Sequence, residues 1–342
     1  MSKVYGIDIG TSTLKISQKD VGVVYNQKNV IAVFDKKKII ATGDEAWAMD
    51  GRAPSEIEVI HPVHSGVLAE LKKMTEMLDI VFEKIGEEHG KMTGQEFLVA
   101  IPSYATEVER KALVDLVAAT SVKPKRIRVV DRPIADAVGV GINIRECFGT
   151  IIVDVGADTT EISVVSLGGI VVSRMLNFGG NRMDESIISA VRKDYNFLIG
   201  RKTAEQIKNT LGSANDPSDD EITMMKAFGR DIISGLPGSI RVDSSFVYFT
   251  IQEHLQIIAE TVRNILEHCD PEISLDILES GMYLTGGASG IKDFDRLLAG
   301  ITGLKVTKCP KGSESVAVGL ELIAENQKLD FLAEKYEMMQ IM

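Results

Sequence analysis

Two segments of the same design constrain this chain more than any other feature. "YGIDIGTSTLKIS" begins at Tyr5, and "TIIVDVGADTTEISVVS" begins at Thr150. Each is a β-branched apolar run, then Asp-x-Gly, then small or hydroxyl residues, then a second β-branched run, which predicts a strand, a tight turn and a returning strand. Such a turn exposes backbone N–H groups beside one carboxylate and suits an anion. The repeat therefore predicts a duplicated phosphate-binding domain with a nucleotide between the copies.

The chemistry of the two turns supports this prediction. Glycine at positions 10 and 156 permits the turn and a close approach of the backbone to phosphate. Asp8 and Asp154 cannot bind phosphate directly, because like charges repel, so we predict that they hold a hydrated Mg²⁺. For either segment alone, a plain β-hairpin with an Asx-type turn is an equally good interpretation. The occurrence of both favours the phosphate-binding interpretation.

A third segment, "YLTGGASGIKDFDRLL" (283–298), predicts a strand that ends in a glycine turn and a helix from about Ile291. Taken alone it is a generic strand-to-helix loop. A flat adenine or ribose can pack on such a backbone turn, close to a helix N-terminus. Placed after the two hairpins, it supplies the site for the base.

Bulk properties limit the classes of protein that fit. A chain of 342 residues exceeds one ordinary core, so two or more domains are expected. A net charge of −11 argues against nucleic acid as a partner. We expect no membrane span, because no apolar run has the required length, and no signal peptide, because Met1-Ser2-Lys3 leads directly into a strand. The scattered cysteines predict free thiols in a reducing cytosol, at Cys147, Cys269 and Cys309.

Strand-like and helical segments alternate, which predicts α/β layering. We expect a meander of strands at 4–9, 14–18, 21–25, 29–34 and 38–41, and helices at 66–88 and 106–119. Gly168-Gly169 predicts a hairpin turn. Thr203 and Gln206 predict a helix N-cap with a capping box. The stretch 313–338 predicts two helices.

Several long stretches resemble the actin-like ATPase superfamily and, within it, the MreB/Mbl-type bacterial actin homologues. The resemblance implies an α/β actin-like ATPase fold, with two duplicated ribonuclease-H-like halves that each carry a small inserted subdomain. It covers nearly the whole chain and rests on the segments "GDEAWAMDGRAPSEIEVIHPVHSGVLAE" (43–70), "IPSYATEVERKAL" (101–113), "EISVVSLGGIVVSR" (161–174), "GGNRMDESI" (179–187), "LIGRKTAEQIKNTLGSA" (198–214), "SGLP" (234–237) and "LTGGASGIKDFDRLL" (284–298).

Four subdomains follow from this resemblance. The first large subdomain would comprise 1–30, 66–148 and 315–342, and its small insertion 31–65. The second large subdomain would comprise 149–180 and 246–314, and its small insertion 181–245.

The resemblance also assigns roles to individual residues around ATP–Mg²⁺. Asp8 and Asp154 would hold the hydrated metal. For Glu205 and Lys208, expected at the ribose and base, a solvated helix pair is the alternative. The remaining nucleotide contacts would come from Gly10, Thr11, Ser12 and Thr13 at the β- and γ-phosphates, from Gly156, Ala157, Asp158 and the catalytic Thr159 at the γ-phosphate, and from Gly286, Gly287, Ala288 and Ser289 at the adenine.

One departure from the family pattern concerns catalysis. The family has a water-positioning glutamate before the proline, and this chain has Arg132 before Pro133. Arginine cannot act as a base, although its charge can stabilise a γ-phosphate. Asp136 lies one turn further on and can pair with Arg132. Either Asp136 takes over the orientation of water, or the site binds ATP and hydrolyses it slowly. We favour the second, because a self-neutralising pair leaves no free base.

Other departures concern the two loops. Lys15 follows Asp8 by seven positions, the spacing at which actin has a phosphate-contacting lysine, and a phosphate contact and an exposed strand lysine are both open. Ala157 restricts the backbone where the family has glycine. Asp158 adds negative charge, which is tolerable near phosphate mainly if it faces the metal.

The function implied is an ATP-binding cytoskeletal filament that organises cell-wall (peptidoglycan) synthesis and cell shape. Its partners would be itself, through head-to-tail contacts that allow paired protofilaments, and the cell-shape membrane proteins RodZ, MreC and MreD. We expect a cytoplasmic location that permits contact with the inner face of the membrane. For that contact the loop 87–95 offers only Met92, and the tail 331–342 is an amphipathic or docked terminal helix.

Three rival classes stay open. A chaperone-type or sugar-kinase-type ATPase shares the fold, although the chain ends too early for a peptide-binding domain of the chaperone type. A plasmid-positioning or organelle-positioning filament differs only in its cargo. A nucleotide-binding regulator would no longer polymerise.

Overall fold

The computed structural model describes residues 3–145 and 149–335, so Cys147 and the tail beyond 335 lie outside the described residues. The chain divides into two compact units. The first comprises Met1–Cys147, Val165–Ser173 and Glu314–Met342, and the second comprises Phe148–Val164 and Arg174–Ser313. The finer division into four subdomains stays a prediction.

A six-stranded sheet organises the first unit, in the order β19-β10-β9-β1-β2-β3. β1 is antiparallel to β2 and parallel to β9, which is parallel to β10. The strands are β1 (Val4–Ile9), β2 (Thr13–Gln18), β3 (Gly22–Lys28), β9 (Glu96–Ile101), β10 (Arg126–Asp131) and β19 (Glu334–Lys335).

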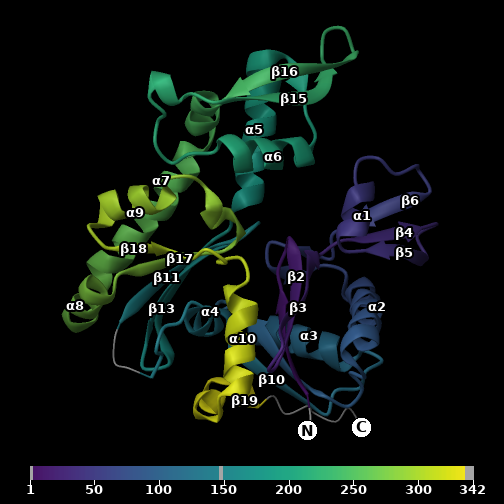
Figure 1. The fold of residues 1–342 in the computed structure, drawn as a ribbon, viewed down its shortest axis with the longest axis vertical. Helices are drawn as coiled ribbons and strands as arrows, with labels where there is room; N and C mark the ends of the chain where they lie inside the picture. Colours follow the sequence, from purple (N-terminus) through teal and green to yellow (C-terminus); the bar gives the residue numbers. More distant parts are fainter. Residues whose placement is uncertain (1–2, 146–148, 336–342) are drawn as a thin grey trace. The chain divides into compact units, whose positions relative to one another are not determined.

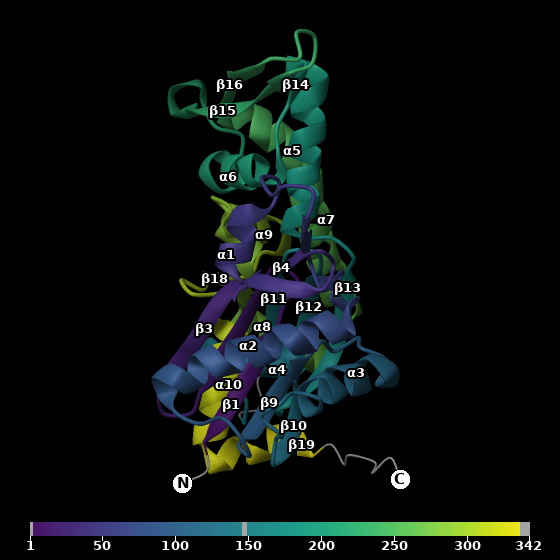
Figure 2. The same cartoon turned by 90° about the vertical axis from the view of Figure 1, so that its right-hand side faces the viewer.

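Helices cover both faces of this sheet, and the alternating side chains of β1 show which helix packs on which face. Tyr5, Ile7 and Ile9 pack in one core with the apolar faces of α2 (Leu71–His89) and α3 (Glu107–Ala118). Gly6, one residue out of phase, approaches Leu320 of α10 (Ser315–Glu325) on the other face. Figure 2 shows α2 and α3 in front of the sheet, and Figure 1 shows α10 on the opposite side. Asp8, two residues after Gly6, lies on the same face of the sheet as Gly6.

The predicted single meander is wrong, because the chain changes sheets after β3. β4 (Ile31–Phe34), β5 (Lys38–Thr42) and β6 (Ile57–Ile60) form a separate sheet in the order β5-β4-β6, beside α1 (Asp44–Met49). The buried Asn29 anchors the chain at this change. Its side-chain amide donates to the Gly10 carbonyl at 2.8 Å, and its backbone N–H donates to the Ser12 carbonyl at 2.9 Å. A short hairpin, β7 (Val63–His64) and β8 (Val67–Leu68), then delays α2 to Leu71, later than predicted.

The second unit is built on a five-stranded sheet in the order β13-β12-β11-β17-β18, with a three-stranded sheet β14-β15-β16 (Figure 1). Residues 165–173, at the tip of the β12–β13 hairpin, are grouped with the first unit. The strands are β11 (Thr150–Val155), β12 (Thr160–Ser166), β13 (Gly169–Leu176), β14 (Phe197–Leu198), β15 (Met224–Asp231), β16 (Pro237–Asp243), β17 (Met282–Thr285) and β18 (Val306–Lys308). The α-helices are α5 (Gly180–Tyr195), α6 (Arg201–Leu211), α7 (Ser244–His268), α8 (Pro271–Ser280) and α9 (Phe294–Thr302), with 3₁₀ turns η1 (Asp219–Glu221) and η2 (Gly287–Gly290).

Three local predictions need correction. The β12–β13 turn consists of Leu167 and Gly168, both at positive φ, one residue earlier than predicted. α6 begins at Arg201 after Gly200, with no side-chain cap, so Thr203 is not an N-cap. After α10 the chain forms the 3₁₀ turn η3 (Gln327–Leu332) and β19 instead of a second helix, because β19 pairs with β10 and Asp330 of η3 pairs with the buried Arg128.

A capping box does occur, at the start of α3. The Thr106 hydroxyl accepts a hydrogen bond from the Glu109 N–H at 3.3 Å, and the Glu109 carboxylate accepts one from the Thr106 N–H at 2.8 Å. We expect Thr106→Ala to lower the free energy of unfolding by about 1 kcal/mol. Urea denaturation measures this, with Thr203→Ala inside α6 as the matched control, which we expect to be close to neutral. An equal loss in both variants would contradict the capping role.

Candidate functional site

The two Asp-x-Gly turns have the same backbone geometry. The Gly10 N–H donates to the Thr13 carbonyl at 3.0 Å, and the Gly156 N–H donates to the Thr159 carbonyl at 2.9 Å. A Cβ at Gly10 would lie 2.8 Å from the Thr13 oxygen, and one at Gly156 would lie 2.9 Å from the Thr159 oxygen. Both turns therefore need glycine because of a close approach of backbone atoms. Ala157 is accommodated because its φ is not positive.

Two cations flank Asp8 in the first unit. Lys15 lies opposite Asp8 in the β1–β2 register, and its Nζ lies 3.4 Å from Asp8 Oδ2 while donating to Thr13 Oγ1 at 2.7 Å. Arg132 Nη2 lies 3.3 Å from Asp8 Oδ1 and donates to the carbonyl of Ile9 at 3.3 Å. Lys15 is only 6% exposed, which excludes the exposed-lysine alternative.

Several residues that the sequence did not single out hold the first turn. Asn29 binds the backbone of Gly10 and Ser12, as described above. Lys28 Nζ donates to Ser12 Oγ at 3.4 Å and lies 4.9 Å from the centre of the Trp47 ring. Lys28 is the last residue of β3 and Asn29 follows it directly, and no motif marks either of them in the sequence. The turn is therefore bordered by Lys15, Lys28 and Arg132, which suits a polyanion.

Arg132 and Asp136 lie on α4 (Arg132–Gly139), which directly follows β10 and has Pro133 in its first turn, as predicted. α4 packs against α10 with backbone contact: a Cβ at Gly139 would lie 1.8 Å from the Ser315 carbonyl oxygen, and one at Gly319 would lie 1.7 Å from that of Ala135. Asp136 is fully buried. Its pairing with Arg132 stays a prediction.

In the second unit, the turn after β11 contacts the start of α5. The carbonyls of Gly156 and Ala157 accept hydrogen bonds from the N–H groups of Gly180 at 3.0 Å and Asn181 at 2.8 Å. The Asp158 carboxylate accepts from the side-chain amide of Asn181 at 2.7 Å. The "GGNRMDESI" stretch (179–187), which begins α5, thus fixes the second turn.

The glycine turn after β17 lies against the end of β11, the strand that carries Asp154. Gly286 has φ +87°, and a Cβ there would lie 2.3 Å from Asp154 Oδ1. Ser289 Oγ donates to the Gly286 carbonyl at 2.7 Å, which closes η2. Ala288 borders Gly180, where an added Cβ would lie 3.3 Å from the Ala288 Cβ. The structure thus brings Asp154, the second turn and the 286–290 turn together.

A buried ion pair links α5 and α6 beside this turn. Lys208 Nζ donates to the Gly180 carbonyl and to the Asp184 carboxylate, both at 2.9 Å. The two side chains are 6% and 9% exposed. Burial raises the pKa of Asp184 to about 6, against the opposing attraction of Lys208. Lys208 is therefore already engaged, and the nucleotide roles of Lys208 and the half-buried Glu205 stay predictions.

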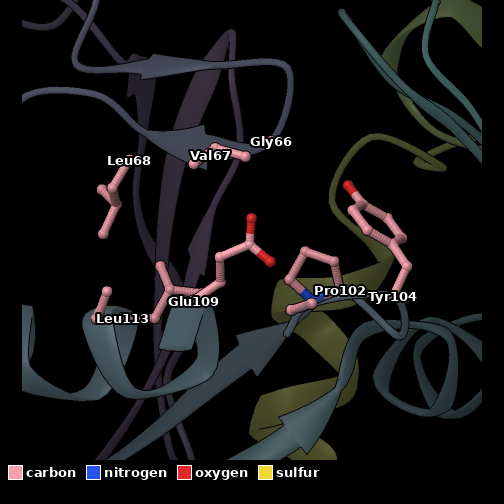
Figure 3. A pocket seen from close by; sticks show the side chains of 9 residues that line it. Gly66, Val67, Leu68, Pro102, Tyr104, Glu109 and Leu113 are labelled. Atoms are coloured by element: carbon pink, nitrogen blue, oxygen red, sulfur yellow. The ribbon is translucent and has the colours of Figure 1, made fainter. Parts of the chain in front are cut away.

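The first unit also has a pocket of about 390 Å³, including its open mouth, between the β7–β8 hairpin and the start of α3. Figure 3 shows the Glu109 carboxylate directed into the space between Gly66 and Pro102. The pocket adjoins the first turn, because the Gly66 N–H donates to Thr11 Oγ1 at 3.3 Å. Its other lining residues are mostly apolar: Val67, Leu68, Tyr104, Ala105, Ala112 and Leu113.

For membrane contact, the described residues offer little of what was expected. Met92, the apolar residue of the candidate loop, is 3% exposed and belongs to the core of the first unit. Within 3–145 and 149–335, none of the helices has the length and apolar character needed to cross a bilayer.

The MreB/Mbl protein family model matches residues 2–330. Among curated proteins, the cell shape-determining protein MreB of Escherichia coli (strain K12) is 36% identical over 318 residues, which cover 92% of this chain and 90% of the relative. The cell shape-determining protein Mbl of Bacillus subtilis (strain 168) is 34% identical over 323 residues, or 94% of this chain and 95% of the relative.

Solved structures show the same relationship. MreB5 of Spiroplasma citri bound to ADP has a TM-score of 0.88 and 30% identity, and the match covers 94% of this chain and 96% of the other. The AMPPNP-bound form of that protein also has a TM-score of 0.88, with 29% identity over 97% and 98% of the two chains. The MamK double helical filament, at 21% identity and a TM-score of 0.75, shares the actin-like fold.

Proposed function

Because the chain belongs to the MreB/Mbl family and is thus an actin-like cytoskeletal protein of the MreB type, we propose that it binds ATP and assembles into filaments that organise cell-wall synthesis and cell shape. The observation that carries the nucleotide part is the pair of matching glycine turns, one in each unit. Crystal structures of MreB5, at 29–30% identity, contain ADP or AMPPNP and support the same role here.

The roles of individual residues belong to this proposal. The first turn and its bordering cations bind the β- and γ-phosphates, the second turn with Thr159 faces the γ-phosphate, and the 286–289 turn lines the adenine. Hydrolysis is slow, because Arg132 replaces the family's water-positioning glutamate and the fully buried Asp136 is poorly placed to reach water. ATP closes the two halves, and the closed form favours head-to-tail contacts that propagate into filaments.

The finer predictions on partners and location also remain proposals. RodZ, MreC and MreD are the partners that the family resemblance suggests. The filament is cytoplasmic and works at the inner face of the membrane.

ATP-dependent sedimentation tests the proposal. We expect the protein to pellet with ATP or a non-hydrolysable analogue, to form filaments in electron micrographs, to pellet less with ADP, and to release phosphate slowly. Gly156→Ala should abolish pelleting, because the added Cβ would lie 2.9 Å from the Thr159 carbonyl oxygen. Gly169→Ala is the matched control, since its nearest neighbour would lie 3.8 Å away. Equal pelleting in all nucleotide states would contradict nucleotide gating, and no pelleting at all would favour a kinase, a chaperone or a regulator.

A further inference from the structure

We propose that Lys15 and Arg132 replace the divalent cation at the first turn, so that this protein binds nucleoside di- and triphosphates without Mg²⁺. The inference rests on the proposed nucleotide binding. It concerns the metal: the family resemblance implies that Mg²⁺ is needed, whereas here the chain's own cations take its place.

The surroundings of Asp8 carry the inference. Asp8 is one of the two residues predicted to hold a hydrated Mg²⁺, and it is 5% exposed. Its Oδ2 faces Lys15 Nζ at 3.4 Å, and its Oδ1 faces Arg132 Nη2 at 3.3 Å. A hydrated Mg²⁺ needs carboxylate oxygens as acceptors for its water ligands. Here Oδ2 accepts from Lys15 Nζ, and Oδ1, which accepts no hydrogen bond from the described residues, lies at ion-pair distance from Arg132, so two cations already offset the charge of Asp8 and would repel a divalent ion. With two cations at this distance, Asp8 fits the role of a metal ligand poorly on grounds of charge.

The two cations are fixed in place by other bonds. Lys15 Nζ donates to Thr13 Oγ1 at 2.7 Å, and Arg132 donates to the Ile9 carbonyl at 3.3 Å. Their side chains are 7% and 12% exposed, so they interact in an environment that water screens weakly. The two acceptors, Ile9 and Thr13, lie on opposite sides of the Gly10 turn. The positive groups are thus held where the turn is expected to receive phosphate.

The chemistry of these groups suits phosphate without a metal. An ammonium and a guanidinium donate charge-assisted hydrogen bonds to phosphate oxygens, and a guanidinium can do so in a bidentate manner. Lys28, which donates to Ser12 Oγ at 3.4 Å, adds a third cation at the turn. These three cations can together neutralise the phosphates at the first turn.

Titration of the full chain with a fluorescent ADP analogue, in excess Mg²⁺ and in EDTA, tests the inference. We expect the wild-type Kd to differ by less than about threefold between the two conditions. Arg132→Glu restores a carboxylate and removes a cation, so we expect its Kd to be at least about tenfold weaker in EDTA than in Mg²⁺. The matched control is Lys111→Glu, the same change of charge on an exposed residue of α3, which should behave like the wild type.

The outcomes separate the two proposals. A tenfold or larger loss of wild-type affinity in EDTA would overturn the metal-independent mode and leave nucleotide binding intact. Absence of binding in both conditions would overturn the proposed function as well. If circular dichroism shows that Arg132→Glu is unfolded, Arg132→Gln takes its place, and weaker binding in EDTA than in Mg²⁺ is again expected. Binding of Arg132→Gln that is equally insensitive to EDTA would exclude Arg132 as the replacement for the metal.

Discussion

Lys208→Met is expected to lower the free energy of unfolding by about 3–5 kcal/mol, the loss typical of a buried ion pair that keeps only one partner. Lys208 Nζ is the cation bound by the buried Asp184 carboxylate at 2.9 Å, and it also binds the Gly180 carbonyl. Without it, Asp184 would be a charge buried between α5 and α6. Guanidinium denaturation at pH 7 measures the change.

The loss should depend on pH. Burial raises the pKa of Asp184 from 3.8 to about 6, so the folded protein binds this proton more tightly than the unfolded chain does. The contribution of this group to stability is therefore complete below about pH 4 and is lost as the pH rises through 6. In Lys208→Met the attraction of the ammonium is gone, which raises the pKa of Asp184 further. We expect a smaller loss at pH 5 than at pH 7, because a protonated Asp184 does not need a cation.

Two controls isolate the buried pair. Asp184→Asn combined with Lys208→Met removes both charges and should recover most of the stability. Arg182→Met breaks the exposed Arg182–Glu185 pair, whose side chains are 62% and 57% exposed, and should change stability by less than about 1 kcal/mol. Equal losses for Lys208→Met at both pH values, or no recovery in the double variant, would show that the pair does not account for the effect.

Gly319→Ala should have the second large effect. The added Cβ would lie 1.7 Å from the Ala135 carbonyl oxygen, so α4 and α10 would have to separate. Overpacking of this kind costs about 1–3 kcal/mol or more. Because α4 carries Arg132, we expect weaker nucleotide binding in addition to a lower melting temperature.

Gly86→Ala is the matched control for this variant. Gly86 also lies within a helix, α2, but a Cβ there would meet no atom within 4 Å. Alanine has the better helix propensity, so this variant should gain up to about 1 kcal/mol. The two substitutions are thus expected to shift the melting temperature in opposite directions. A shift in the same direction would mean that the α4–α10 contact is not the cause.

The predictions that held depend on short-range patterns. The strands on both sides of the Asp-x-Gly turns and the helix after Pro133 follow from local periodicity and backbone preference. The predictions that failed depend on distant partners. Asn29 ends the first meander by binding the first turn, and β19 replaces a predicted helix because β10 offers it an edge. No local pattern reveals such pairings.

The two Asp-x-Gly turns and, by resemblance, the MreB/Mbl family could be predicted from the amino-acid sequence alone. Glycine, β-branched residues and their spacing act within a few positions, so they can be interpreted without the fold. The side chains around each turn, in contrast, depend on how distant segments pack. The β1–β2 register places Lys15 against Asp8, the start of α4 after β10 brings Arg132 to the same carboxylate, and the packing of α6 on α5 places Lys208 against Asp184.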